Sequence, residues 1–174
     1  MGVAITSILP KKEITFQELQ GKKLAVDASN IIYQFLASIR QPDGTPLMDN
    51  NGNITSHLVG LASRVSNLME RNIKLAFVFD GIPPELKFEE SQRRKELKEK
   101  AQEKYGEAKE EDNKEDMYKF SRQTIKLTKE IKEESKEFIK ALGLPAIQAP
   151  SEAEAQASFM AEKGDVFAVV SQDI

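Results

Sequence analysis

The chain has 174 residues, of which 40% are hydrophobic and 30% charged, and its formal net charge is −3. This size and composition suit one domain with a single hydrophobic core. With no cysteine and one histidine, the sequence excludes disulfides, thiolate catalysis and Cys-ligated zinc, and gives little support to His-rich metal sites or a Ser-His-Asp triad. It contains neither a membrane-length apolar run nor a signal-peptide pattern, so we expect a soluble, intracellular protein.

The first part of the chain predicts a β-α-β unit. Residues 22–27 are a short apolar run typical of a buried strand, and an amphipathic helix follows up to Arg40. Residues 41–53 are rich in Pro, Asp, Gly and Asn, which predicts a loop or short hairpin. Thr55 can cap a second helix, and residues 73–79 predict a second strand. The two strands would be parallel, with a right-handed crossover.

The pattern changes over residues 88–116, which are nearly all Glu, Lys, Arg and Gln. Their few apolar positions keep helical spacing but are too sparse to bury a face, and Gly106 interrupts the run. We therefore predict an exposed helical segment, named here the charged excursion. Over residues 117–142 the apolar residues return at 3/4 spacing, which predicts one long helix packed on the core.

The last part of the chain predicts a short strand at 146–149, a helix opened by Ser151 and a final strand at 166–171. The fold class is therefore α/β with a mostly parallel sheet. The sequence stops at Ile174, directly after this strand. Because a parallel sheet normally covers such a strand with a helix, we expect the chain to be a fragment or to have lost its remainder.

Carboxylates follow four of the predicted strands or strand-to-helix junctions: Asp27, Asp80, Glu152 with Glu154, and Asp173. The carboxyl ends of parallel strands meet at one edge of a sheet, where ligands of open α/β folds bind. Acids gathered there repel one another unless a cation neutralises them. The pattern thus predicts an oxygen-liganded site for Mg²⁺ or Mn²⁺, and hence phosphoryl chemistry.

Each carboxylate also has a purely structural explanation. Asp27 can cap the helix after it, Asp80 begins an Asp-Gly turn, Glu154 completes a capping box with Ser151, and Asp173 can be a polar chain end. Caps accept Ser, Thr and Asn as readily as Asp, so four successive carboxylate ends favour the metal site. Two Mg²⁺ ions ~4 Å apart would activate a water and stabilise the leaving oxygen of a phosphodiester.

At these residues the chain resembles the flap endonucleases, structure-specific 5′ nucleases with a PIN-like fold. Residues 149–155, Ala-Pro-Ser-Glu-Ala-Glu-Ala, are highly specific to that family. The Arg-Gln-Pro-Asp-Gly loop at 40–44 and the Lys/Glu-rich composition resemble archaeal members. Matching segments run along nearly the whole chain: 1–2, 26–29, 33–36, 40–44, 55–58, 79–84, 149–155 and 170–173.

The resemblance implies a PIN-like core, incomplete here, with a mostly parallel sheet flanked by helices and a helical arch. Residues 1–174 would be a single incomplete nuclease domain: an N-terminal region at 1–98 that includes the start of the arch, the arch at 88–116, and the beginning of an intermediate region at 117–174. The implied function is a 5′ flap endonuclease and 5′–3′ exonuclease of DNA replication and repair. It would cut branched DNA at single-strand/double-strand junctions by two-metal hydrolysis, in the cytoplasm if the source is archaeal.

The resemblance also implies roles for individual residues. Lys87 and Arg94 would contact the scissile phosphate, Tyr33 would stack on a base near the junction, and Arg40 would contact duplex DNA. The metal ligands, direct or through water, would be Asp27, Asp80, Glu152, Glu154 and Asp173.

Two groups of basic residues have spacings that suit phosphate contacts. In the predicted long helix, Arg122, Lys126 and Lys129 return at 3–4 spacing and would form one basic ridge. In the charged excursion, the basic residues could line an electrostatic funnel for a single strand, although Glu is as numerous there. Those residues are Arg93, Lys98, Lys100 and Lys104.

The chain departs from the family after Asp173, where Ile174 stands in place of an aromatic residue and a second Asp. A further Asp, the helix–two-turn–helix that grips duplex DNA and the carboxy-terminal tail that docks on the sliding clamp are also missing. We therefore expect weak metal binding and poor or no cleavage by this chain alone. The alternatives are a small PIN-type ribonuclease, a non-catalytic DNA- or protein-binding fragment and, more weakly, a phosphoacceptor receiver domain.

Overall fold

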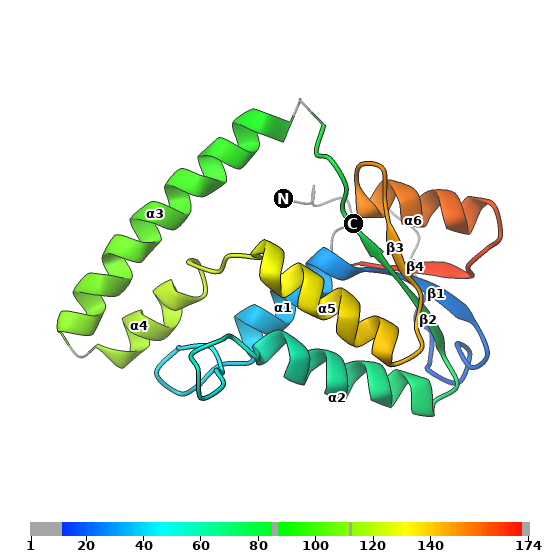
Figure 1. Cartoon of the computed structure of the whole chain (residues 1–174), viewed down its shortest axis with the longest axis horizontal. Coiled ribbons are helices and arrows are strands. Elements are labelled where there is room, and N and C mark those ends of the chain that lie inside the picture. The colour runs from blue at the N-terminus through cyan, green and yellow to red at the C-terminus, as the bar shows by residue number, and fades with distance from the viewer. Residues whose placement is uncertain (1–11, 85–86, 112, 172–174) are drawn as a thin grey trace.

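The computed structural model describes residues 12–84, 87–111 and 113–171. At its centre is a four-stranded sheet in the order β3-β2-β1-β4, and all neighbouring strands are parallel (Figure 1). This confirms the predicted α/β class, although the last two strands are shorter than expected. The strands are β1 (Lys23–Asp27), β2 (Lys74–Phe79), β3 (Ala146–Gln148) and β4 (Ala168–Val170).

Helices cover both faces of the sheet, and alternating strand residues point to opposite sides. Leu24 and Val26 of β1 pack in the larger core with helices α1, α2 and α5, whereas Ala25 faces α6. Small residues of α6, Ala153 and Ala157, are fully buried in this second core and let the helix approach the sheet closely. The bounds are α1 Ala28–Ser38, α2 Ser56–Glu70, α5 Lys129–Ala141 and α6 Ala153–Glu162.

The segment between α1 and α2 is a loop with two isolated antiparallel bridges, Arg40 to Pro46 and Met48 to Ile54. The predicted loop or short hairpin is thus confirmed. Thr55 occupies the N-cap position of α2, but its side chain makes no capping hydrogen bond.

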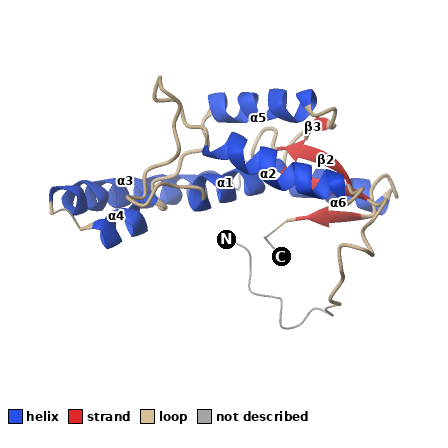
Figure 2. Cartoon of the chain, turned by 90° about the horizontal axis from the view of Figure 1, so that it is seen from below, coloured by secondary structure: helices blue, strands red, loops and turns tan. Residues whose placement is uncertain are grey.

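The charged excursion and residues 117–121 together form a helix pair, α3 (Phe88–Glu110) and α4 (Lys114–Ser121), that projects away from the sheet (Figures 1 and 2). Ala101 and Ala108 are only 3% and 4% exposed because α4 packs against α3. The prediction that this segment could not bury a face was therefore wrong, and α3 continues through Gly106. No helix among the described residues is long and apolar enough to cross a membrane.

The prediction of one long helix over 117–142 is also wrong, because α4 ends at Ser121 and α5 begins at Lys129. Thr128 starts α5 by accepting a hydrogen bond from the Ile131 backbone N–H at 3.4 Å. Ile125 and Leu127 lie in the connecting segment yet pack into the core, so the apolar spacing continues through the break. The ridge predicted for Arg122, Lys126 and Lys129 therefore does not lie on one helix.

Candidate metal centre and nucleic-acid cleft

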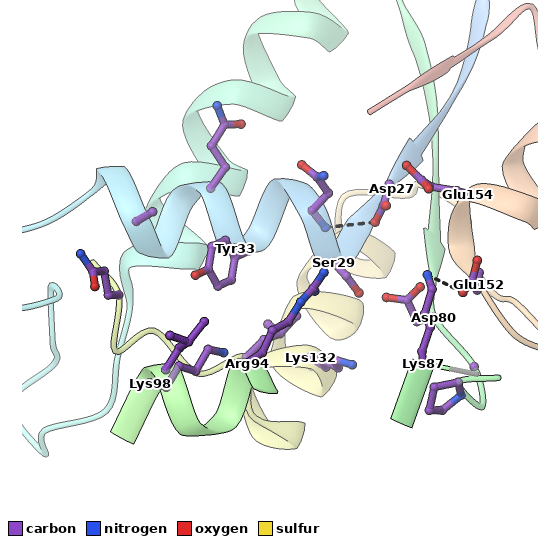
Figure 3. Close-up of a pocket in the computed structure, with 18 of the residues that line it drawn as sticks. Asp27, Ser29, Tyr33, Asp80, Lys87, Arg94, Lys98, Lys132, Glu152 and Glu154 are labelled. Carbon is purple, nitrogen blue, oxygen red and sulfur yellow. Dashed lines mark hydrogen bonds and ion pairs between the residues drawn. The ribbon is translucent and has the colours of Figure 1, made fainter. Parts of the chain in front are cut away.

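Four predicted carboxylates line one open cleft at the carboxyl edge of the sheet (Figure 3). Asp27 ends β1, Asp80 follows β2, and Glu152 and Glu154 lie at the start of α6. Asp173, the fifth predicted ligand, lies outside the described residues. The parallel strand order thus brings together acids that are up to 127 positions apart in the sequence, from Asp27 to Glu154.

Asp80 is fixed to the segment that carries the two glutamates. Its Oδ1 accepts a hydrogen bond from the Ala153 backbone N–H at 2.9 Å, and its backbone carbonyl accepts one from Gln148 Nε2 at 2.6 Å. The next residue, Gly81, lies so close to the Ala149 carbonyl that a side chain would not fit. These contacts hold the end of β2 against the start of α6.

The capping box predicted from Ser151 and Glu154 does not form. Glu152 is the N-cap residue and makes no capping hydrogen bond. Asp80 caps the helix from a distant strand instead, and Glu154 accepts a hydrogen bond from the Ser171 hydroxyl at 3.0 Å. The carboxylates of Glu152 and Glu154 thus do not cap α6.

Asp27 caps a helix and also lies among the four carboxylates that line the cleft. Its Oδ1 accepts a hydrogen bond from the Asn30 backbone N–H at 3.0 Å and so caps α1. Burial raises the pKa of the Asp27 carboxyl, and the negative charges of Asp80 and Glu154 raise it further. Figure 3 shows Asp27 and Glu154 close together. A cation between these carboxylates would relieve their repulsion.

Glu152 faces Lys87, whose Nζ lies 2.5 Å from Glu152 Oε1. The contact is an ion pair without hydrogen-bond geometry, and this buried Oε1 accepts no hydrogen bond from the described residues. Within those residues, no three acidic or histidine side chains converge into a ready coordination shell. The four side chains nevertheless fit a hard divalent cation, because the atoms that would coordinate it are all carboxylate oxygens. One of these atoms, Glu152 Oε1, accepts no hydrogen bond from the described residues.

Cations form the other side of the cleft. Arg94 and Lys98 come from α3, and Lys132 comes from α5. Lys98 Nζ lies 5.9 Å from the ring centroid of Tyr33, and burial, with repulsion from Arg94 and Lys126, lowers its pKa. The cleft encloses 1320 Å³, whereas small-molecule pockets measure roughly 300–1,000 Å³. Size and charge therefore suit a polyanionic chain.

Most of the predicted site residues line this cleft: Asp27, Tyr33, Asp80, Lys87, Arg94, Arg122, Glu152 and Glu154. Arg40, Lys126 and Lys129 are not among the lining residues. The Arg40 guanidinium donates hydrogen bonds to the carbonyls of Leu36 at 2.8 Å and Gly44 at 2.6 Å, so it holds the loop after α1.

Ser29 and Lys132 are cleft residues that the sequence pattern did not single out. Ser29 has a buried hydroxyl that finds no hydrogen-bond partner in the described part of the chain. Lys132 lies in a helix rich in Lys and Glu, where composition distinguishes no single lysine. The sequence signal for Lys132 was its position next to the buried Ile131, which places it at the edge of the helix face that packs on the core.

Comparisons with known proteins agree with this geometry. Flap endonuclease 1 of Pyrococcus horikoshii is 53% identical over 173 residues, a stretch that covers 99% of this chain and 50% of that protein. Flap endonuclease 1 of Pyrococcus furiosus is 51% identical, and the match covers 99% of this chain and 51% of that protein. The structure of flap endonuclease-1 from Methanococcus jannaschii matches with a TM-score of 0.72 at 45% identity, over 99% of this chain and 55% of that one. The catalytic core of Rad2 in complex with DNA substrate matches with a TM-score of 0.65 at 30% identity, over 92% and 42%.

The chain thus spans about half the length of the relatives it matches. Two family models match its two ends: the XPG N-terminal domain over residues 1–103 and the XPG I-region over residues 143–174. The first of these alone covers more than half of the sequence. The chain therefore belongs to the XPG family, of which it carries the N-terminal domain and the I-region.

Proposed function

We propose that the chain is the amino-terminal part of a structure-specific 5′ flap endonuclease that hydrolyses phosphodiesters in branched DNA. The observation that carries the proposal is the meeting of four carboxylates and several cations in one cleft. Carboxylates bind the divalent ions of phosphodiester hydrolysis, and cations bind the phosphates beside them. The names of the relatives support the same reaction.

Asp27, Asp80, Glu152 and Glu154 would hold Mg²⁺, in two ions, with Mn²⁺ as a substitute and Asp173 as a fifth ligand. When bound, these ions would supply Lewis-acid activation of the hydrolytic water and neutralise charge at the phosphate. The protein keeps the four carboxylates in place through the β1 and β2 strand ends and the Asp80 cap on α6.

Lys87 and Arg94 would bind the scissile phosphate, because both line the cleft from the start of α3. Tyr33 would stack on a base near the junction, and its partly exposed ring makes this possible. Arg122 lines the cleft and would contact phosphates there.

Arg40, Lys126 and Lys129 lie outside the lining and would contact the duplex farther from the cut. The charged excursion would act as an arch over the single-stranded flap. The complete protein would dock on a sliding clamp through a carboxy-terminal tail and, in an archaeal cell, would work in the cytoplasm.

The test is cleavage of a 5′-labelled double-flap DNA by the chain, with Mg²⁺ and with EDTA, beside single-stranded DNA and RNA. We expect any product to form at the flap junction, to require Mg²⁺ and to be low in yield from this chain alone. Cutting of single-stranded RNA with intact branched DNA would instead make the chain a PIN-type ribonuclease. Salt-sensitive flap binding without any Mg²⁺-dependent product would make it a non-catalytic binding fragment.

A further inference from the structure

Lys132 is a cleft residue with a different structural support from the other cations. It belongs to α5, a helix anchored in the core by the buried Ile131, Ser135 and Ile139. Arg94 belongs to α3, which projects away from the sheet (Figure 1). The position of Lys132 therefore follows from packing of the core and not from the placement of the charged excursion.

The Lys132 ammonium has no counter-ion within ion-pair distance among the described residues. Neighbouring lysines are used internally: Lys87 pairs with Glu152, and Lys136 pairs with Glu133 at 2.8 Å. Lys132 is half-buried and lines the cleft, and in Figure 3 its side chain extends toward the end that holds Asp80. A half-buried cation without an internal partner is available to an anion that enters from solvent.

We propose that Lys132 binds a backbone phosphate of nucleic acid from the core side of the cleft, beside the cations of α3. The proposal rests on the function proposed above and adds one residue to its binding surface. Phosphates that enter the cleft would then meet a cation from α5 as well as those from α3. Because α5 is part of the core, this contact would form equally with DNA that has a flap and with DNA that has only a recessed 5′ end.

The experiment measures the affinity of the chain for a 5′-flap DNA in EDTA as a function of salt concentration. The variants are Lys132→Ala, Lys132→Arg and, as a matched loss of charge, Lys140→Ala, an exposed lysine nearer the end of the same helix. One lost phosphate contact should reduce the slope of log K against log salt by about 0.9. The affinity deficit of Lys132→Ala should therefore shrink by about threefold between about 50 and 200 mM salt.

Lys132→Arg should restore the wild-type slope of log K against log salt, and Lys140→Ala should leave that slope unchanged. The affinity lost in Lys132→Ala should be the same on DNA with a recessed 5′ end as on flap DNA. If Lys132→Ala keeps the wild-type slope, or if Lys140→Ala reduces the slope as much as Lys132→Ala does, the assignment of Lys132 is overturned. The nuclease proposal would not be affected by either result. A loss confined to flap DNA would overturn the core-side contact. If the unsubstituted chain neither binds nor cuts flap DNA, both proposals fall together.

Discussion

The ion pair between Lys87 and Glu152 places a cation where we propose that a metal ion binds. The Lys87 side chain is 60% exposed and that of Glu152 is 32% exposed, so the pair is only partly shielded from water. Such pairs are weak and separate readily. A divalent ion would displace the ammonium, and Lys87 would then be released toward an incoming phosphate.

Replacing Lys87 with Met should therefore strengthen metal binding while it weakens cleavage. An exposed ion pair is worth up to about 1 kcal/mol, which corresponds to a roughly two- to fivefold gain in affinity. Calorimetric titration with Mn²⁺ measures the change, and Lys140→Met controls for the lost charge. Unchanged or weaker Mn²⁺ binding by Lys87→Met would contradict competition between the ammonium and the metal.

Among the helices and loops, the loop after α1 packs against α4 through Gly44. This residue has a φ of +82°, and a Cβ on it would lie 2.7 Å from Ser121 Oγ and 2.9 Å from Tyr118 Cα of α4. Arg40 holds the Gly44 carbonyl from the other side. The loop thus connects α1, which carries Tyr33, to α4, the helix that packs on α3.

Gly44→Ala should loosen α4, whereas Gly52→Ala should not. Gly52 has a similar φ of +85° but no atom within 4 Å of its Cβ position, so it reports backbone strain alone. Both variants should lose about 1 kcal/mol of stability from that strain. Amide hydrogen exchange over α4 should accelerate only in Gly44→Ala, and equal exchange in the two variants would show that the contact does not hold the helix.

His57 makes the packing of α2 on α5 sensitive to pH. Its ring is fully buried, and Nε2 lies 3.2 Å from Glu134 Oε2. Burial lowers the pKa of His57 although Glu134 opposes the shift, so the unfolded chain binds the proton more tightly. Stability is thus fully present above the unfolded pKa of about 6.5 and is lost as the pH falls toward the folded value.

Urea unfolding at neutral and mildly acidic pH measures this loss. The wild-type free energy of unfolding should decrease by up to about 1.4 kcal/mol for each pH unit between the two pKa values. His57→Gln should have a smaller decrease, because it removes the group whose pKa differs between the folded and unfolded states. An identical pH dependence in the two proteins would exclude His57 as the origin.

The strand ends could be predicted from the sequence because short apolar runs and their polar ends are local signals. Asp27 and Asp80 follow from such runs, and parallel pairing then places them at one edge. Two features could not be predicted in this way. The break before α5 is hidden because Ile125 keeps the helical spacing outside a helix, and the α6 cap comes from Asp80, 73 residues away from Ala153.

In the molecule as a whole, the sheet edge and the helices beside it supply opposite charges to one cleft. The sheet edge contributes carboxylates, and α3, α5 and the end of α4 contribute cations. The net charge of −3 conceals this separation, since acids and bases nearly balance over the sequence. A metal centre and a phosphate-binding wall can therefore lie in one cleft of a chain that is acidic on average.

Whether the carboxylates at the sheet edge bind divalent metal can be measured by Mn²⁺ titration of the chain and of its Asp80→Asn variant. Asn keeps an oxygen that can accept the hydrogen bond from Ala153, so α6 should stay capped and the thermal unfolding midpoint should be unchanged. We expect saturable Mn²⁺ binding by the chain and an affinity lower by about tenfold or more in Asp80→Asn, a loss of at least about 1.4 kcal/mol. Equal Mn²⁺ binding by both proteins would contradict the metal centre.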